Sequence, residues 1–90
     1  MKRTRVHVSG IVQGVCFRAA TRRAAADLNL TGWVRNMRDG RVEAIFEGDD
    51  AAVKKIVEWC QVGPPAARVD KVILMEEQYM GLFSGFSIKY

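Results

Sequence analysis

The sequence predicts an α+β fold in which two helices cover one face of a mainly antiparallel sheet. The length of 90 residues is enough for one domain, and we expect residues 1–90 to form it. Segments with strand and helix patterns follow one another in the order β-α-β-β-α-β, with an optional short fifth strand at the end. This order is the split β-α-β arrangement of the ferredoxin-like α/β sandwich.

The first strand and the first helix flank a loop that contains two glycines. Residues 5–9 alternate polar and apolar side chains, which predicts a strand. A loop over residues 10–17 follows, and the alanine-rich segment 18–30 predicts a helix with an apolar stripe. Gly32 lies just beyond this segment and is expected to stop the helix.

The middle of the chain predicts a β-hairpin. Residues 31–36 are rich in β-favouring side chains, and residues 41–47 place Val42, Ala44 and Phe46 on one face. Residues 37–40 end in Asp-Gly, which tolerates the positive φ that a tight turn needs.

The last third predicts a helix and one or two strands. Asp49 or Asp50 is expected to cap a helix over about residues 51–61, which the Gly-Pro-Pro sequence at 63–65 ends. Residues 68–77 predict a fourth strand, and residues 86–90 a short last one after a loop.

Charge and cysteine content limit the possible functions. The net charge of +4 suits an anionic substrate, but the 14 basic residues are scattered among 10 acidic ones, which argues against nucleic acid as a partner. Two cysteines in a chain of this size indicate reduced thiols. No apolar run spans a membrane and no signal sequence is visible, so we expect the protein in the cytoplasm. A monomer is the default expectation.

The loop between the first strand and the first helix has the features of an anion seat. Gly10 and Gly14 permit tight turning, and Arg18 stands at the start of the helix. Unpaired N–H groups and the positive end of the helix dipole attract anions there. A guanidinium adds a planar fork suited to phosphate oxygens.

The predicted topology gives this loop a partner, Asn36. In the split β-α-β arrangement the first two strands are parallel with the third between them, so their C-terminal ends lie on one edge. The loop follows the first strand and Asn36 ends the second. Two strand spacings, about 10 Å, would then separate them, which leaves room for a phosphate and one water.

Two motifs and the C-terminus resemble one family. The sequences G-I-V-Q-G-V-C-F-R at 10–18, G-W-V-R-N-M-R-D-G at 32–40 and F-S-I-K-Y at 86–90 are similar to the signatures and the usual C-terminus of the acylphosphatases. Cys16 stands where many members have glycine and others have cysteine.

This resemblance implies hydrolysis of a small acyl phosphate to a carboxylate and phosphate, with neither metal nor cofactor. It implies that Arg18 binds the phosphate and that Asn36 positions the attacking water. The backbone N–H groups implied to bind the phosphate as well are those of Gln13, Gly14, Val15, Cys16, Phe17 and Arg18.

The chemistry of the residues is compatible with this activity. An acyl phosphate has a good leaving group, so no strong acid is needed, and a guanidinium with N–H donors can stabilise charge on the phosphoryl oxygens. An asparagine can orient water but is a poor base. We therefore take the substrate's own phosphate as a candidate proton acceptor.

Two other classes of function remain as alternatives. Cys16 and Arg22 have the C-x5-R spacing of cysteine-dependent phosphatases, in which a thiolate attacks phosphorus. The glycines precede Cys16, however, and Arg23 replaces the hydroxyl residue of that motif. The other alternative is a ferredoxin-like binding or regulatory module without catalysis, although residues 41–47 carry one aromatic and two acids, which suits RNA poorly. The chain begins and ends at the predicted edges of the domain, which favours an independent enzyme.

Several conspicuous residues have structural interpretations. We expect Gln13 to shape its loop rather than to bind a ligand through its side chain. The residues expected to serve packing are Phe17, Trp33 and Trp59, and His7 is expected to be either a solvent-facing or a packed strand residue.

Overall fold

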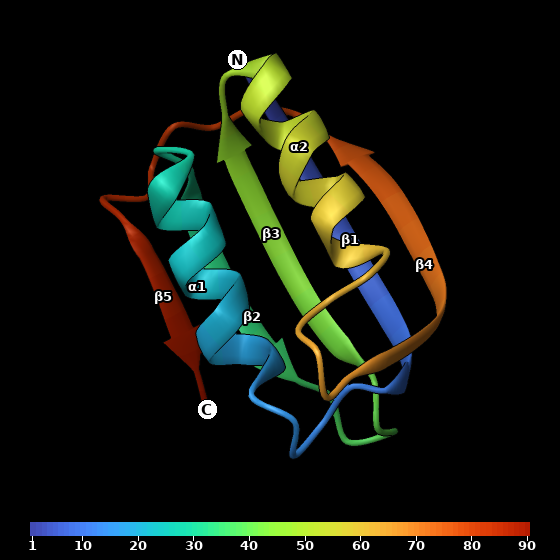
Figure 1. The fold of residues 1–90 in the computed structure, drawn as a ribbon. Coiled ribbons are helices and arrows are strands. Elements are labelled where there is room, and N and C mark those ends of the chain that lie inside the picture. The colour runs from blue at the N-terminus through green and yellow to red at the C-terminus, as the bar shows by residue number, and fades with distance from the viewer.

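The computed structural model describes residues 1–90 and contains the predicted elements in the predicted order (Figure 1). The optional fifth strand is present. The elements are β1 (Lys2–Ile11), α1 (Phe17–Asp27), β2 (Thr31–Asn36), β3 (Val42–Gly48), α2 (Asp50–Cys60), β4 (Arg68–Glu77) and β5 (Phe86–Lys89).

The five strands form one sheet in the order β4-β1-β3-β2-β5. Neighbouring strands are antiparallel except for β5, which runs parallel to β2. Both helices lie on the same face of this sheet, α1 toward the β2–β5 side and α2 toward the β1 side (Figure 1). The ferredoxin-like fold is thus confirmed. Neither helix has the length and apolar character that a membrane span requires.

The core lies between the helices and the sheet. Alternate residues of each central strand face the helices and are almost fully buried, as strand geometry requires. From α2, Ile56 is completely buried against them. The buried core residues are Val6, Val8, Val12, Phe17, Ala25, Leu30, Val34, Val42, Ala44, Phe46, Val53, Ile56 and Cys60. Burying a side chain such as Ile56 contributes about 2–3 kcal/mol.

The opposite face of the sheet carries a charged network in place of a second apolar layer. Glu43 is 4% exposed, and its carboxylate accepts hydrogen bonds from Arg5 at 2.9 Å, His7 at 2.7 Å and Arg35 at 2.7 Å. Burial alone would raise the pKa of Glu43, but these donors outweigh it and hold the pKa at about 2.

His7 links this network to Arg41. A guanidinium can only donate, so Nδ1 of His7 accepts a hydrogen bond from Arg41 at 3.1 Å, and Nε2 donates to the carboxylate of Glu43 at 2.7 Å.

The end of α1 corrects one expectation from the sequence. Gly32 does not stop the helix, which ends at Asp27. Asn29 adopts φ +57°, and the N–H of Leu30 donates to the carbonyl of Ala25 at 2.9 Å, which closes the helix end in the manner of a Schellman motif. Gly32 instead lies in β2 with φ +132°, where a Cβ would come within 1.9 Å of a carbonyl oxygen in β3.

Two further boundaries differ in detail. Strand β1 covers Lys2–Ile11 and not only residues 5–9, because it is paired on both sides, by β3 and by β4. Asp49 precedes α2 as its N-cap residue, but its side chain makes no capping hydrogen bond. Asp50 instead forms an ion pair of 3.3 Å with the N-terminal ammonium of Met1.

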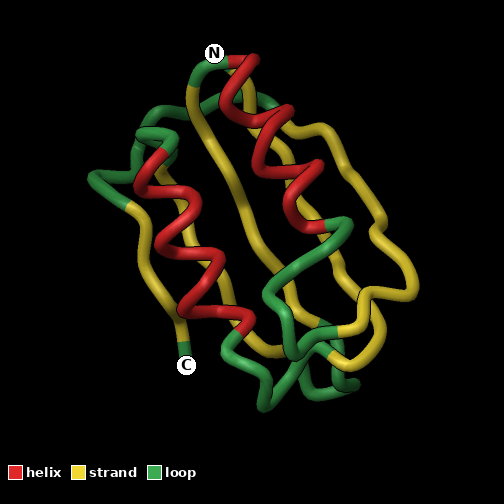
Figure 2. Tube along the Cα trace, in the orientation of Figure 1, coloured by secondary structure: helices red, strands yellow, loops and turns green.

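The strand register brings the ends of β1 and β2 to one edge of the sheet. Val8 pairs with Val42, which pairs on its other side with Asn36. The loop after β1 and the β2–β3 turn consequently gather at the same end of the molecule (Figure 2).

Candidate active site

The loop between β1 and α1 presents a run of free backbone donors. Gly14 has φ +75°, and the space beside its Cα is open. Cys16 is also left-handed, with φ +64°, and no side chain caps the helix that follows. The N–H groups of residues 13–19 consequently donate no hydrogen bond within the protein. Such a set of donors at a helix N-terminus favours an anion.

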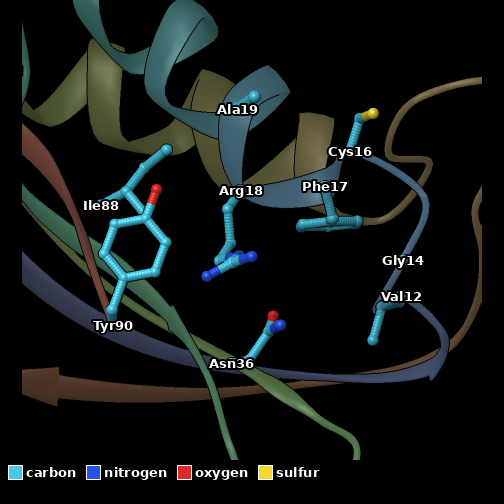
Figure 3. A pocket seen from close by; sticks show the side chains of 9 residues that line it. All are labelled: Val12, Gly14, Cys16, Phe17, Arg18, Ala19, Asn36, Ile88 and Tyr90. Atoms are coloured by element: carbon cyan, nitrogen blue, oxygen red, sulfur yellow. The ribbon is translucent and has the colours of Figure 1, made fainter.

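Arg18 extends from the first turn of α1 toward Asn36 (Figure 3). Its guanidinium forms no ion pair with any carboxylate, and its neighbour is the ring of Tyr90, whose centroid lies 5.0 Å from Cζ. A cation over an aromatic face is held by electrostatic attraction that leaves its N–H donors free. The partly buried Arg18 is therefore oriented but not neutralised.

Asn36 contributes an acceptor without a donor. It ends β2 on the same side of the strand as Val34, so its side chain faces the helices and not the charged face of the sheet. Its Oδ1 is buried and has no hydrogen-bond partner, the only side-chain polar atom in the chain in that condition. Buried acceptors are almost always satisfied, so this oxygen marks a place for a ligand or a water.

Arg18 and Asn36 line one cavity of about 370 Å³. In Figure 3 their side chains point toward one another, with Tyr90 on one side and Val12 and Phe17 on the other. The lining residues are Val12, Gly14, Cys16, Phe17, Arg18, Ala19, Asn36, Ile88 and Tyr90. The predicted juxtaposition of the loop with Asn36 is therefore present.

The sequence interpretation missed the contribution of β5 to this cavity. Ile88 pairs with Val34 in the parallel register, which places Tyr90 beside Asn36. The alternation of Phe86, Ile88 and Tyr90 was a signal for one shared face, but it did not reveal which strand β5 would join.

The side chains of the predicted loop residues have different surroundings. Phe17 is buried in the core, 5.6 Å from the ring of Trp59. The amide of Gln13 donates to the β2–β3 turn and does not line the cavity. The exposed thiol of Cys16 points away from the space between Arg18 and Asn36 (Figure 3).

The arrangement gives little support to the cysteine-dependent alternative. Arg22, which that mechanism requires beside Cys16, is exposed and does not line the cavity. The second thiol, that of Cys60 at the end of α2, is buried in the core, and burial raises its pKa to about 12. No three side chains of the metal-binding types His, Cys, Asp and Glu come together.

The fold and the cavity together define a small ferredoxin-like domain with an unpaired cation and a free acceptor at one end of its sheet. Comparison with known protein families identifies the family to which this domain belongs. The model of the acylphosphatase family matches residues 4–88, and the chain belongs to that family. It is thus an enzyme of the acylphosphatase type, whose substrate is a small acyl phosphate.

Individual relatives agree with this assignment over whole chains. An acylphosphatase from Rubrobacter xylanophilus is 54% identical over 88 residues, which cover 98% of this chain and 80% of the relative. One from Pelotomaculum thermopropionicum is 53% identical, with all of both chains covered. The crystal structure of acylphosphatase from Bacillus subtilis is 38% identical, covers all of both chains and superposes with a TM-score of 0.96.

Proposed function

We propose that this protein hydrolyses the carboxyl-phosphate anhydride of acyl phosphates at the cavity between Arg18 and Asn36. Water attacks phosphorus, the bond from phosphorus to the acyl oxygen breaks, and a carboxylate and inorganic phosphate result. One observation supports this most strongly: a guanidinium without a carboxylate partner and a buried carbonyl oxygen without a donor line the same cavity.

In this proposal the cationic side of the cavity holds the phosphate. The guanidinium of Arg18 binds two phosphoryl oxygens, and the N–H groups of residues 13–18 bind the others. Charge on these oxygens is then stabilised by donors that are in place before the substrate arrives, which lowers the barrier of phosphoryl transfer.

Asn36 orients the nucleophile. Its Oδ1 accepts a hydrogen bond from the attacking water, which directs a lone pair of the water toward phosphorus. The proton released from that water passes to a phosphoryl oxygen of the substrate, because no Asp, Glu or His side chain lines the cavity to receive it. The carboxylate leaves without protonation.

The proposal requires neither metal nor cofactor, since Arg18 and the loop provide the charge stabilisation. We further infer that residues 1–90 act as one domain, because all five strands belong to one sheet. We also infer that the domain works as a monomer, since the residues that the proposed mechanism needs, Arg18, Asn36 and the 13–18 loop, belong to one chain and Arg18 and Asn36 line one cavity. Two free cysteines support a location in the reducing cytoplasm.

The test is hydrolysis of benzoyl phosphate in the presence of EDTA. We expect the wild type to be active, and Arg18→Ala and Asn36→Ala each to lower kcat/KM by about 100-fold or more. Arg18→Lys should remain strongly impaired, because an ammonium cannot reproduce the planar fork. Arg18→Ala should also abolish competitive inhibition by inorganic phosphate.

Arg23→Ala is the matched control, because Arg23 is an exposed arginine of the same helix that lies outside the cavity. It should retain wild-type activity. Full activity of both the Arg18 and the Asn36 variants would refute the mechanism, and loss of wild-type activity on adding EDTA would show that a metal is required. If the single variants Cys16→Ser and Arg22→Ala were both inactive, the cysteine-dependent alternative would be favoured.

A further inference from the structure

The β1–α1 loop is joined to the β2–β3 turn by a single side chain, that of Gln13. Its Nε2 donates to the carbonyl oxygen of Met37 at 2.7 Å and to that of Arg41 at 3.0 Å. Both donor hydrogens of one primary amide are used on these two carbonyls, which fixes the orientation of the amide. The backbone of residues 12–15 makes no hydrogen bond to the turn.

The two carbonyls belong to residues close to Asn36, one next to it along the chain and one next to its partner across the strand pair. Met37 is the next residue in the chain, and Arg41 precedes Val42, the strand partner of Asn36. The turn is closed by its own bonds, from the N–H of Met37 to the carbonyl of Arg41 at 2.7 Å and from the N–H of Gly40 to the carbonyl of Met37 at 3.3 Å. These bonds lie within the turn itself, and the amide of Gln13 adds a link to it from the β1–α1 loop.

We propose that Gln13 is a positioning residue that fixes the distance between the phosphate-binding loop and Asn36. This inference rests on the proposed function, in which the loop holds phosphate and Asn36 holds water. The loop and the N-terminus of α1 form one half of the site and the end of β2 forms the other. Without the amide of Gln13 each half keeps its own ligand, but the water no longer lies in line with phosphorus.

The test compares Gln13→Leu and Gln13→Glu in benzoyl phosphate hydrolysis. Leucine of similar size removes both donors, and glutamate of the same length also directs a negative charge at two carbonyl oxygens. We expect kcat to fall by about 100-fold for Gln13→Leu, because displacement of a reacting group by about 1 Å has that effect, and to fall further for Gln13→Glu. Inhibition by inorganic phosphate should stay close to that of the wild type for Gln13→Leu, since the loop donors and Arg18 are retained.

A double-mutant cycle separates positioning from general damage. If Gln13 acts through Asn36, Gln13→Leu should have little further effect on kcat in an Asn36→Ala background. Gln78 is an exposed glutamine whose side chain makes no hydrogen bond. The variant Gln78→Glu is therefore the control for the added charge and should remain fully active. Circular dichroism and thermal unfolding confirm that each variant is folded at the assay temperature.

The outcomes distinguish this inference from the proposed function. A Gln13→Leu variant with wild-type kcat, or one whose effect multiplies in full with that of Asn36→Ala, would overturn the positioning role while the Arg18 variants still report on the mechanism. Full activity of both Arg18→Ala and Asn36→Ala would instead refute the proposed function itself.

Discussion

Replacing Glu43 with glutamine should destabilise the protein at neutral pH and much less in acid. Glu43 has a pKa of about 2 in the fold against an ordinary value of 4.5, because His7, Arg35 and Arg5 stabilise its charged form against the opposing effect of burial. A shift of about 2.5 pKa units corresponds to about 3 kcal/mol of stability. Since the folded pKa is the lower one, this contribution is complete above about pH 4.5 and is lost as the pH falls through about 2.

The assay is equilibrium urea unfolding of the wild type and Glu43→Gln at several pH values. The difference in free energy of unfolding should be largest near pH 7 and smaller by about half of the 3 kcal/mol near pH 3. Titration of other groups affects both proteins, so it largely cancels from the difference. A difference that does not change with pH, or none at pH 7, would refute the reasoning.

Three further predictions follow from single residues. Cys16→Gly should keep its activity and change the free energy of unfolding by less than about 1 kcal/mol, because the left-handed φ of +64° suits glycine; an inactive variant in the benzoyl phosphate assay would implicate the thiol. Tyr90→Phe should match the wild type in kcat/KM because it keeps the ring that faces Arg18. Tyr90→Ala, which lacks the ring, should lower kcat/KM by about two- to fivefold. Equal kcat/KM values for the two variants would show that the ring does not help to orient Arg18. Gly32→Ala should lower the free energy of unfolding by about 3 kcal/mol or more, because its Cβ would lie 1.9 Å from the carbonyl oxygen of Ile45, and unchanged urea unfolding would contradict this.

Local patterns predicted most of the fold. The bounds of β2 and β4 agree with the sequence to the residue, because β-favouring side chains are concentrated in both segments. The error at the end of α1 arose because glycine is the usual left-handed residue after a helix, and here Asn29 takes that conformation three positions earlier. The position at which α1 ends depends on the burial of Leu30, which is 3% exposed in the core. It is therefore set by tertiary packing, which local sequence patterns do not encode.

The site was predicted in part. Topology alone brought Arg18 and Asn36 to one edge of the sheet, and the structure places them in one cavity, while their catalytic roles stay predictions. The place of Tyr90 depends on the parallel pairing of β5 with β2, a contact between distant parts of the chain that local patterns do not encode. Gln13 was expected to shape its loop, but its acceptors are backbone carbonyls, which have no signature in the sequence.

The distribution of arginine partners supports the proposal that Arg18 binds the phosphate. Five of the nine arginines, Arg3, Arg5, Arg35, Arg41 and Arg68, pair with carboxylates. Of the other four, Arg22, Arg23 and Arg38 are exposed, where water solvates an unpaired guanidinium well. Arg18 alone is both partly buried and without a carboxylate. Partial burial removes water from the guanidinium of Arg18, and without a counter-charge this desolvation is unfavourable in the free protein. In the proposed mechanism a bound phosphate dianion provides that counter-charge. Because the guanidinium is already partly desolvated before the substrate arrives, binding the dianion has less desolvation to overcome.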